Sequence, residues 1–297
     1  MSFCICLREL LSCMHMKTVK VTRFDTASLV GILRPLYLAF KEIEDGERTC
    51  FDLSSVSFAP PLFILPLVAY LKSTGGSVSG SSPVLQSYLD CIHFPDGIDS
   101  VSGFEALAQS SKTYVPISVL KKRSGAERER LETMFSSMVL KVLGASQASS
   151  AIHYPISELV TNIIEHSKVE EGYVFGQYYP RKSYLDICIA DCGKGLAGSY
   201  FDELGLKFSD TEAIEEVLKG HSTKMNTERG FGVRTSKRVV CEAMGGEFML
   251  LSGSAVLVAN KKKQQLVTLP DFHWQGVIIA YRIPKPRGPI DITPYLE

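Results

Sequence analysis

The sequence lacks an excess of charge of either sign. Its 32 Lys and Arg residues balance its 32 Asp and Glu residues, and its isoelectric point is about 7.0. Such a chain has no bulk electrostatic attraction to nucleic acid or to an acidic membrane surface. It also lacks any run approaching the roughly 20 apolar residues that a membrane-spanning helix needs. We therefore expect no nucleic-acid partner and no membrane association.

Paired cysteines and a secretion signal are absent as well. The opening segment MSFCICLRELLSCMHMKTVK contains an apolar run, but Arg8 and Glu9 interrupt it and no basic region precedes it, unlike a signal peptide. The eight cysteines are scattered without the spacing of a disulfide framework or a zinc site. Reduced thiols are typical of cytosolic proteins, so we expect a cytoplasmic location.

Strand and helix signals alternate over residues 17–115. KTVKVTRF, TCFDLSSVSF and the short SVSGSS have the character of strands. SLVGILRPLYLAFKEIEDG, PLFILPLVAYLKSTGG and SPVLQSYLDCIHF have helical character, and glycines close the first two. This rhythm predicts a small α/β domain over residues 17–115. A length of 297 residues also favours two domains over one.

The segment 116–150 changes character and is interpreted as a helical linker. KKRSGAERERLETMF is rich in charge, and the following SSMVLKVLG is apolar at helical spacing. Leu131, Phe135, Met138 and Val142 lie at i, i+4, i+7 and i+11, so they form one stripe of a helix. The stripe fits core or inter-domain packing, or else the seam of a dimer.

Residues 151–284 form the second predicted domain. The helix YPISELVTNIIEHS leads to the strands EGYVFGQYYP and YLDICIADCGKG, and a long loop-and-helix region follows. After the helix VRTSKRVVCEAMG, three strands close the chain at EFMLLSG, SAVLVANK and GVIIAYRIP. This order predicts an α/β sandwich with a mixed, largely antiparallel sheet. Neither an internal repeat nor a low-complexity tract is present in the sequence.

One helix of this domain gathers polar side chains on one face. At 100° per residue, Glu158, Asn162, Glu165 and His166 fall within about a quarter of the circumference. The opposite side carries the apolar residues Ile152, Ile156, Leu159, Val160, Ile163 and Ile164. The polar face predicts either a functional site or a plain solvated stripe.

Two glycine-rich turns follow along the chain. In ICIADCGKGL, Asp191 ends an apolar strand and enters a turn with Gly193 and Gly195, where backbone can approach a ligand closely. A carboxylate there can accept a hydrogen bond from an exocyclic amine such as that of adenine, unless the segment is an ordinary turn. In HSTKMNTERGFGVRTSKRVV, Gly230 and Gly232 open a basic helix.

Backbone N–H groups at such a helix start point at an anion, and the helix dipole favours negative charge there. Lys224 and Arg234 would add charge-assisted hydrogen bonds to the same phosphate oxygens. The alternative is a flexible turn before an ordinary surface helix.

The order of these elements resembles the GHKL ATP-binding superfamily, which includes gyrase, the ninety-kilodalton heat-shock chaperones, histidine kinases and MutL. The matching pattern is Glu-x-x-x-Asn on a helix, then Asp-x-Gly-x-Gly, then Gly-His-Ser-Thr and Arg-Gly-x-Gly before a helix, over residues 125–284. The resemblance implies the GHKL (Bergerat) α/β sandwich and binding of ATP with Mg²⁺.

The resemblance also implies roles for single residues. Asn162 would give its amide oxygen to Mg²⁺, Glu158 would be the catalytic base, and Asp191 would bind the adenine amine in a pocket shaped by Gly193 and Gly195. Residues 220–228 would form a mobile lid. The further nucleotide contacts that it implies are Gly220, Ser222, Thr223, Lys224, Arg229, Gly230, Phe231, Gly232 and Arg234.

The sequence departs from the family in two places. Many members have Gly-Thr where this chain has Gly276-Val277, and that threonine usually supports the adenine-binding aspartate. Val277 therefore weakens nucleotide affinity, or a water or another hydroxyl takes over the role. His153 lacks the flanking residues of a histidine phospho-acceptor, which disfavours an ordinary sensor kinase. ELVTNIIEHS looks closest to the anti-sigma-factor serine kinases.

The N-terminal segment CFDLSSVSFAPPLFILPLVAYLKSTGGSVS resembles a STAS domain, the fold of anti-sigma-factor antagonists. In those antagonists a phosphorylated serine begins the helix after the DLS strand. Here the segment Phe58–Pro61 has no hydroxyl, although Ser54, Ser55 and Ser57 lie nearby. The resemblance therefore implies a regulatory or docking role with a protein partner, and not a phosphorylated antagonist.

Two functions follow from these resemblances. The first is an enzyme, a Mg²⁺-dependent ATPase or a protein serine/threonine kinase-like regulator, with Glu158 as base. The second is a nucleotide-gated interaction module with little or no turnover, in which ATP orders residues 220–228 and changes a partner surface. GHKL proteins are often dimers, so a homodimer is a further expectation.

Overall fold

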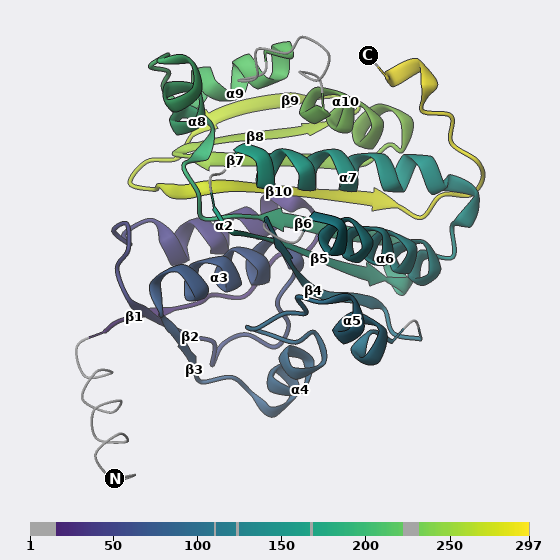
Figure 1. The fold of residues 1–297 in the computed structure, drawn as a ribbon. Coiled ribbons are helices and arrows are strands. Elements are labelled where there is room, and N and C mark those ends of the chain that lie inside the picture. Colours follow the sequence, from purple (N-terminus) through teal and green to yellow (C-terminus); the bar gives the residue numbers. More distant parts are fainter. Residues whose placement is uncertain (1–15, 110, 123–124, 167–168, 222–231, 297) are drawn as a thin grey trace.

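The structure is a computed structural model that describes residues 16–109, 111–122, 125–166, 169–221 and 232–296, with side chains masked from 163 to 166. Within these ranges, seven strands form one large sheet in which all neighbouring strands are antiparallel (Figure 1). In sheet order, they are β4 (Tyr114–Lys121), β5 (Glu171–Tyr179), β6 (Tyr184–Ala190), β10 (Trp274–Pro284), β7 (Glu247–Gly253), β8 (Ala255–Asn260) and β9 (Gln264–Thr268). The large antiparallel sheet agrees with the α/β class expected from the sequence.

The N-terminal part contributes a small parallel sheet and the helices around it. Within the described residues its strands are β1 (Lys17–Lys20), β2 (Thr49–Asp52) and β3 (Ser77–Ser79). Its helices are α2 (Leu29–Phe40), α3 (Pro61–Thr74), α4 (Pro83–Cys91) and α5 (Val101–Leu107). Every strand and helix predicted between residues 17 and 94 is present, with shorter strands than the sequence indicated.

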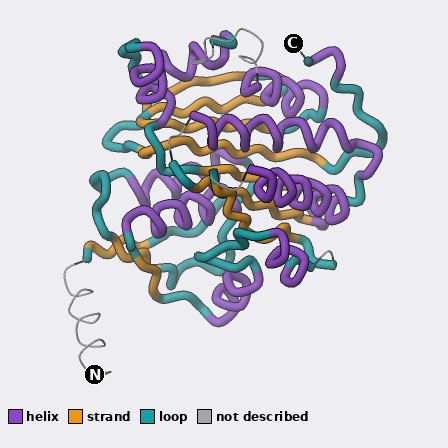
Figure 2. Tube along the Cα trace, in the orientation of Figure 1, coloured by secondary structure: helices purple, strands orange, loops and turns teal. Residues whose placement is uncertain are grey.

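Helices of the second part cover one face of the large sheet, as Figures 1 and 2 show. They are α6 (Gly125–Leu143), α7 (Ser149–His166) and α10 (Gly232–Arg238), the last continuing as the π-helical η3 (Val239–Ala243). Helices α8 (Gly195–Leu204) and α9 (Asp210–Lys219) pack near β7, β8 and β9. Short 3-10 turns occur at η1 (Ser146–Ala148), η2 (Pro180–Lys182) and η4 (Thr293–Tyr295).

Both faces of the large sheet are buried at β5, β6, β10 and β7, because the N-terminal helices α2 and α3 cover the face opposite α6, α7 and α10. Along β6, Ile187 and Ile189 pack with the α7 side, whereas Cys188 and Ala190 pack with α3. Successive residues of a strand point to opposite faces, so a sheet covered on both sides needs apolar residues at nearly every position. This explains the continuous apolar run of β6.

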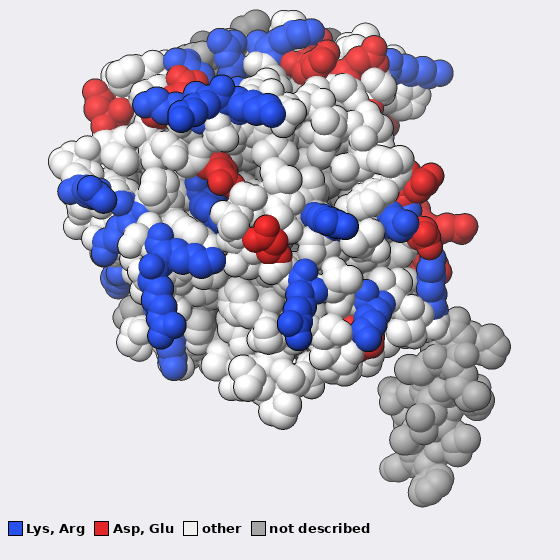
Figure 3. All heavy atoms as spheres, turned by 180° about the vertical axis from the view of Figure 1, so that it is seen from behind, with Lys and Arg blue, Asp and Glu red and all other residues white. Residues whose placement is uncertain are grey.

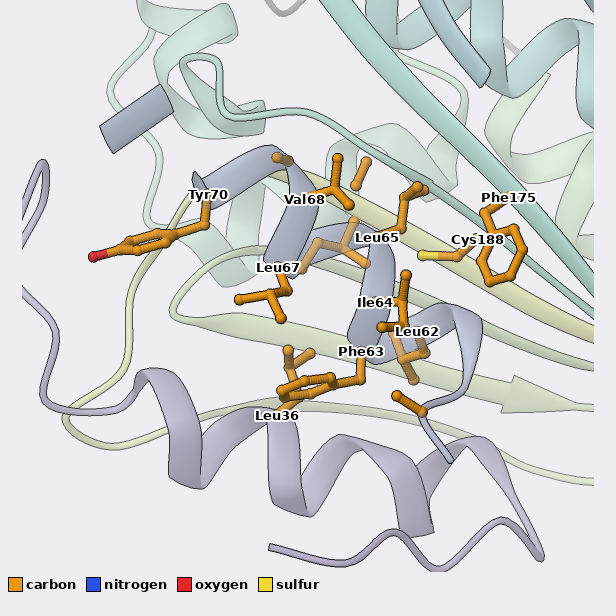
Figure 4. Packing of buried hydrophobic residues seen from close by; sticks show 14 of the residues in the cluster. Leu36, Leu62, Phe63, Ile64, Leu65, Leu67, Val68, Tyr70, Phe175 and Cys188 are labelled. Atoms are coloured by element: carbon orange, nitrogen blue, oxygen red, sulfur yellow. The ribbon is translucent and has the colours of Figure 1, made fainter. Parts of the chain in front are cut away.

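Helix α3 lies between the two parts and is buried on all sides over Pro61–Leu71. Figure 4 shows Phe63 against Leu36 of α2 on one side, and Leu65 near Cys188 and Phe175 of the large sheet on the other. A helix that is apolar all round is typical of the interior of a protein. The buried helix predicted from PLFILPLVAYLKSTGG is therefore confirmed.

The range 116–150, expected to be a helical linker, contains most of β4 as well as α6 and η1. Strand β4 pairs with β5 at the edge of the large sheet, so this range contributes a strand that the sequence reading missed. The stripe on α6 packs into the core of the large sheet: Leu131, Phe135 and Met138 are buried and Val142 is half-buried against them. The stripe thus serves core packing. The boundaries of the two predicted domains, 17–115 and 151–284, stay a prediction.

A buried ion pair joins the N-terminal part to the large sheet. The guanidinium of Arg282 on β10 donates to both carboxylate oxygens of Asp186 on β6, at 2.7 and 2.8 Å. Its remaining nitrogen donates to the backbone carbonyls of Thr26 and Ala27, at 3.1 and 3.0 Å. The guanidinium of Arg282 therefore holds the chain that enters α2 against the sheet, because it hydrogen-bonds to Asp186 on one side and to the backbone of Thr26 and Ala27 on the other.

The mixture of charges on the surface and the free thiols of the described cysteines agree with the composition. On the face in Figure 3, Lys and Arg side chains are spread over the molecule and interspersed with Asp and Glu. Within the described residues, none of the helices combines the length and the apolar character needed to cross a bilayer. The cysteines of these residues are free thiols: Cys50, Cys91, Cys188, Cys192 and Cys241.

Candidate functional site

Helix α7 carries Glu158 and Asn162 one turn apart, and α10 packs against it. Both side chains are half-buried, while Ile152, Ile156 and the neighbouring apolar residues are buried in the core. The amphipathic division predicted for this helix is therefore present over residues 152–162. The side chains of Glu165 and His166, also placed on the polar face, lie outside the described residues.

Gly232, the first residue of α10, lies directly against the polar face of α7. A Cβ placed on Gly232 would lie 2.6 Å from Glu158 Oε2 and 2.9 Å from Asn162 Nδ2. Real Cβ atoms essentially never approach another heavy atom this closely, so a glycine is required unless the side chains move. The structure thus brings the second glycine of the Gly-x-Gly segment, which is distant in the sequence, against the carboxylate and the amide of α7.

Sequence reasoning missed a second carboxylate beside this group. Glu132 on α6 is half-buried, and burial raises its pKa, while the Ser157 hydroxyl lowers it and the negative charge of Glu158 raises it further. Glu132 directly follows Leu131 in the charge-rich run that begins α6. Only the packing of α6 on α7 distinguishes this glutamate from its exposed neighbours.

Asp191 follows β6 directly and is completely buried. Its Oδ1 accepts a hydrogen bond from the backbone N–H of Gly193 at 2.7 Å. Its Oδ2 has no hydrogen-bond partner among the described residues. Burial raises the pKa of Asp191 to about 7, although the backbone N–H groups of Gly193 and Val277 lower it. A buried acceptor without a partner is rare in folded proteins and indicates a donor supplied by a ligand or water.

Glycines permit the tight packing around Asp191. Gly276 on β10 has a φ of +124°, and a Cβ there would lie 2.3 Å from the carbonyl oxygen of Asp191. Gly195 has a φ of +68°, and its Cβ would lie 2.9 Å from Ser252 Oγ. Both conformations are ones that side-chain-bearing residues rarely adopt. In the sequence, Gly276 stands out only because Val277 follows it where many family members have threonine.

The side chain of Val277 does not take over the role of the family's threonine, which supports the adenine-binding aspartate. Its backbone carbonyl accepts from the Asp191 N–H at 3.0 Å, and its side chain packs in the core. The nearby buried hydroxyl is that of Ser252 on β7, which donates to the Gly276 carbonyl at 3.0 Å and accepts from the Leu196 N–H at 2.9 Å. Ser252 therefore braces the turn and not the carboxylate, and sequence reasoning did not find it.

The remaining predicted contacts are only partly described. Gly220 ends α9 with a φ of +86°, and its N–H caps the last turn. Arg234 on α10 donates to the backbone carbonyl of Lys219 at 3.5 Å. The following predicted residues lie outside the described part of the chain: Ser222, Thr223, Lys224, Arg229, Gly230 and Phe231.

The donor types at the site suit Mg²⁺ and a nucleotide. Among the described residues there is no cluster of three or more His, Cys, Asp or Glu side chains that would hold a metal by itself. Mg²⁺ commonly takes one or two protein oxygens and completes its shell with phosphates and water. Asn162 and Glu158 offer such oxygens, and the unpartnered oxygen of Asp191 can accept from an exocyclic amine. These residues therefore fit the ligands that the resemblance implies.

Comparison with known proteins bears on the same region. No curated protein and no solved structure matched the chain. Residues 147–271 match the family model described as "Histidine kinase-, DNA gyrase B-, and HSP90-like ATPase", a range that includes Glu158, Asn162, Asp191 and Gly232. The match supports a GHKL-type, ATP-binding domain in this part of the chain.

Proposed function

We propose that this chain binds ATP together with Mg²⁺ and turns it over, as an ATPase or a protein serine/threonine kinase-like regulator. The observation that carries the proposal is the close approach of Gly232 to Glu158 and Asn162, with atoms 2.6 and 2.9 Å from the position of a Cβ. Asn162 would hold the metal through its amide oxygen, which would neutralise phosphate charge when bound. Gly232 would present its backbone N–H toward the phosphates.

Asp191 would select the base. Its buried Oδ2 lacks a partner among the described residues, so an exocyclic amine would satisfy an acceptor that is otherwise left unpaired. Guanine carries a carbonyl at the equivalent position, and its oxygen would repel the carboxylate. We therefore expect the site to prefer ATP over GTP.

Glu158 would act as the general base that orients and deprotonates the attacking hydroxyl or water. Its carboxylate lies on the same helix as Asn162 and against the backbone of Gly232, so it faces the position where phosphates would be held. Phosphoryl transfer depends mainly on positioning and charge neutralisation, which these few side chains can supply.

ATP hydrolysis and nucleotide binding, measured on the same variants, test the proposal. Glu158→Gln should keep nucleotide affinity and lower turnover by about 100-fold or more, which is typical of a lost general base. Asn162→Ala should lose the Mg²⁺-dependent part of the affinity, and Asp191→Asn should lose the preference for ATP over GTP. Glu215→Gln, an exposed glutamate of α9, is the matched control and should behave as wild type. A wild-type chain that binds no nucleotide would contradict the proposal.

A second candidate is a nucleotide-gated interaction module with little turnover. It is favoured by the contact between the N-terminal part and the Asp191 turn, where Trp274 donates to the Asp191 carbonyl and also packs on Phe40 of α2. Firm binding of ATP by the wild type without product formation would support this candidate over the enzyme.

We further propose that residues 17–115 form a STAS-like regulatory domain through which a protein partner acts, in the cytoplasm and with a homodimer as the working form. The parallel order of β1, β2 and β3 with α2 and α3 is compatible with such a domain. Pro60 and Pro61 are buried at the start of α3, and Pro60 has no side-chain capping bond. A phosphorylation switch at this helix start is therefore not part of the proposal.

A further inference from the structure

The chain contains a single tryptophan, and it lies between the N-terminal part and the proposed nucleotide site. Trp274 begins β10 and is 3% exposed. Its indole Nε1 donates a hydrogen bond to the backbone carbonyl of Asp191 at 3.0 Å. One side chain from the last strand of the sheet thus contacts the backbone of the residue proposed to recognise the base.

The Asp191 carbonyl depends on this indole because the regular pairing of β6 and β10 ends just before it. The register runs as far as Ile278 and Ala190, and the β10–β7 pairing shifts between Trp274 and Val277. The Asp191 N–H still reaches the Val277 carbonyl, but its own carbonyl accepts from a side chain. Removal of that donor would leave a buried carbonyl unpaired, which costs more than the net value of the hydrogen bond.

The other side of the indole packs against an aromatic cluster of the N-terminal part. Phe40, the last residue of α2, meets Trp274 edge-on, with ring centroids 5.5 Å apart and an interplanar angle of 81°. Phe40 also contacts Tyr70 of α3 at 5.4 Å and Phe51 of β2 at 5.1 Å. Tyr70 and Phe51 contact each other at 5.5 Å. The cluster therefore connects α2, α3 and the small sheet to one donor at the Asp191 turn.

A second contact links the same two parts. Cys192, the residue after Asp191, is half-buried, and burial raises its pKa to about 12, although the hydroxyl of Ser73 on α3 lowers it. The N-terminal part therefore contacts this region at two places. Ser73 lies at Cys192, and Phe40 lies against Trp274. Phe40, Tyr70, Ser73, Cys192 and Trp274 also line one small cavity at this junction.

We propose that Trp274 is a positioning residue that couples the packing of the N-terminal part to the affinity of the nucleotide site. This inference rests on the proposed function of Asp191 as the base-recognising acceptor. Trp274 holds the Asp191 peptide, and Phe40 holds the indole. A partner that shifts α2 or α3 therefore changes the orientation of the Asp191 carboxylate, and nucleotide binding favours the N-terminal packing that keeps it in place.

The full-length protein provides the test, because Trp274 is an intrinsic fluorescent reporter at the junction. Addition of ATP and Mg²⁺ to the wild type should change the emission of Trp274. Trp274→Phe keeps an aromatic ring and removes the donor, so it should weaken ATP binding about 2- to 10-fold, the factor expected for one hydrogen bond. It should also speed amide hydrogen exchange at residues 192–196. Unchanged affinity and exchange in Trp274→Phe would overturn the proposal.

A matched pair of variants separates coupling from a general loss of stability. Phe40→Leu removes the contact with Trp274, whereas Phe63→Leu truncates an equally buried phenylalanine that packs on Phe24. We expect Phe40→Leu, and not Phe63→Leu, to shift Trp274 emission, speed exchange at residues 192–196 and weaken ATP binding. Equal effects of both variants would overturn the proposal.

The outcome also distinguishes this inference from the proposed function. If the wild type binds no nucleotide, the proposed function fails, yet the exchange comparison between Phe40→Leu and Phe63→Leu still decides whether the N-terminal part positions the turn. If ATP binds and the two variants exchange alike, the coupling fails while the proposed function stands.

Discussion

The backbone of Gly232 lies so close to the carboxylate of Glu158 that a Cβ would fall 2.6 Å from Oε2. The two residues come from helices that are separated by the whole of β5, β6, α8 and α9 in the chain. Their contact follows from the packing of α10 on α7. It leaves no room for a side chain at position 232 unless Glu158 moves, which leads to the first prediction.

Gly232→Ala should impair function more than stability. The added methyl group meets the end of the Glu158 side chain, which can turn away at a cost of about 1 kcal/mol in the free energy of unfolding. The displaced carboxylate would then lower ATP turnover by about 100-fold, because a shift of about 1 Å in a catalytic group has that effect. Urea unfolding and ATP hydrolysis measure the two quantities.

Gly125→Ala is the control for this substitution. Gly125 begins α6, and a Cβ there would have no heavy atom within 4 Å. Alanine should change the free energy of unfolding by less than about 0.5 kcal/mol, because Gly125 begins the helix and the larger preference for alanine over glycine applies to helix interiors. Turnover should not change. A Gly232→Ala variant with wild-type turnover would show that Gly232 does not limit the site.

Nucleotide affinity should rise with pH through the pKa of Asp191, which burial raises to about 7. Only the ionised carboxylate is a pure acceptor, and the apparent affinity scales with its population. Between pH 6 and pH 8 that population rises about 10-fold for a pKa of about 7. Binding of ADP with Mg²⁺ to the wild type and to Asp191→Asn measures the effect, and the variant supplies the baseline for ionisation of the nucleotide itself. Parallel pH profiles would contradict the assignment.

The same carboxyl makes stability depend on pH in the opposite direction. Its pKa is about 7 in the folded chain and near its ordinary 3.8 when unfolded, so between these values the native state binds the extra proton. The contribution to stability is therefore complete below about pH 4 and is lost as the pH rises through about 7. Urea unfolding at pH 5 and pH 8 should show a smaller pH dependence for Asp191→Asn than for the wild type.

Loss of Arg282 should be among the most destabilising single changes. Arg282→Met leaves the carboxylate of Asp186 buried without its partner, and such losses cost about 3–5 kcal/mol. Burial already raises the pKa of Asp186, while Arg282 lowers it, so the variant should carry a still higher pKa. Its free energy of unfolding should then fall further between pH 5 and pH 8 than that of the wild type.

A double variant provides the check on the ion pair. Replacement of both partners, Arg282→Met with Asp186→Leu, removes the uncompensated charge and should recover much of the lost stability. The carbonyls of Thr26 and Ala27 would still lack their donor, so recovery should be incomplete. A double variant no more stable than Arg282→Met would show that the carboxylate is not the source of the loss.

The two predicted domains should not fold well apart. Residues 61–71 of α3 are buried between α2 and the large sheet, so a chain of residues 116–284 would expose the sheet face that α3 covers. An exposed apolar sheet face promotes aggregation. We expect the fragment 116–284 to aggregate or to bind a hydrophobic dye, and co-expression with residues 1–115 to restore a soluble complex. A monomeric, cooperatively folding fragment would contradict this expectation.

The fold was predictable where hydrophobic periodicity is strong. Helix α3 and strands β5, β6, β7 and β8 carry clear apolar patterns and were found near their observed bounds, whereas α6 was expected only as part of a helical linker over residues 116–150. Strand β4 was missed because YVPISVLK adjoins a charge-rich run and contains a proline. Strand β9 was missed because QQLVT is short and mostly exposed at the sheet edge, where no apolar alternation is required.

The residues of the candidate site likewise fall into two groups, those identified from the sequence and those that only the structure reveals. Glu158, Asn162 and Asp191 were identified by residue type, spacing and the family pattern. Glu132, Ser252 and Trp274 were not, because each lies in an unremarkable local sequence and meets the site only through packing of α6, β7 or β10. A single sequence does not show which polar residue lies beside which across a sheet or between two helices.

By itself the sequence determined which segments are apolar on one face or on both, where glycine permits a turn, and which side chains can bind a metal or an amine. These are local properties, fixed by residue type and by the periods of helices and strands. The tertiary structure decided that Gly232 meets Glu158, that Asp191 keeps one buried oxygen unpaired, and that Trp274 joins the N-terminal part to the Asp191 turn. Such contacts follow from how apolar faces pack across long stretches of chain, and no local pattern specifies them.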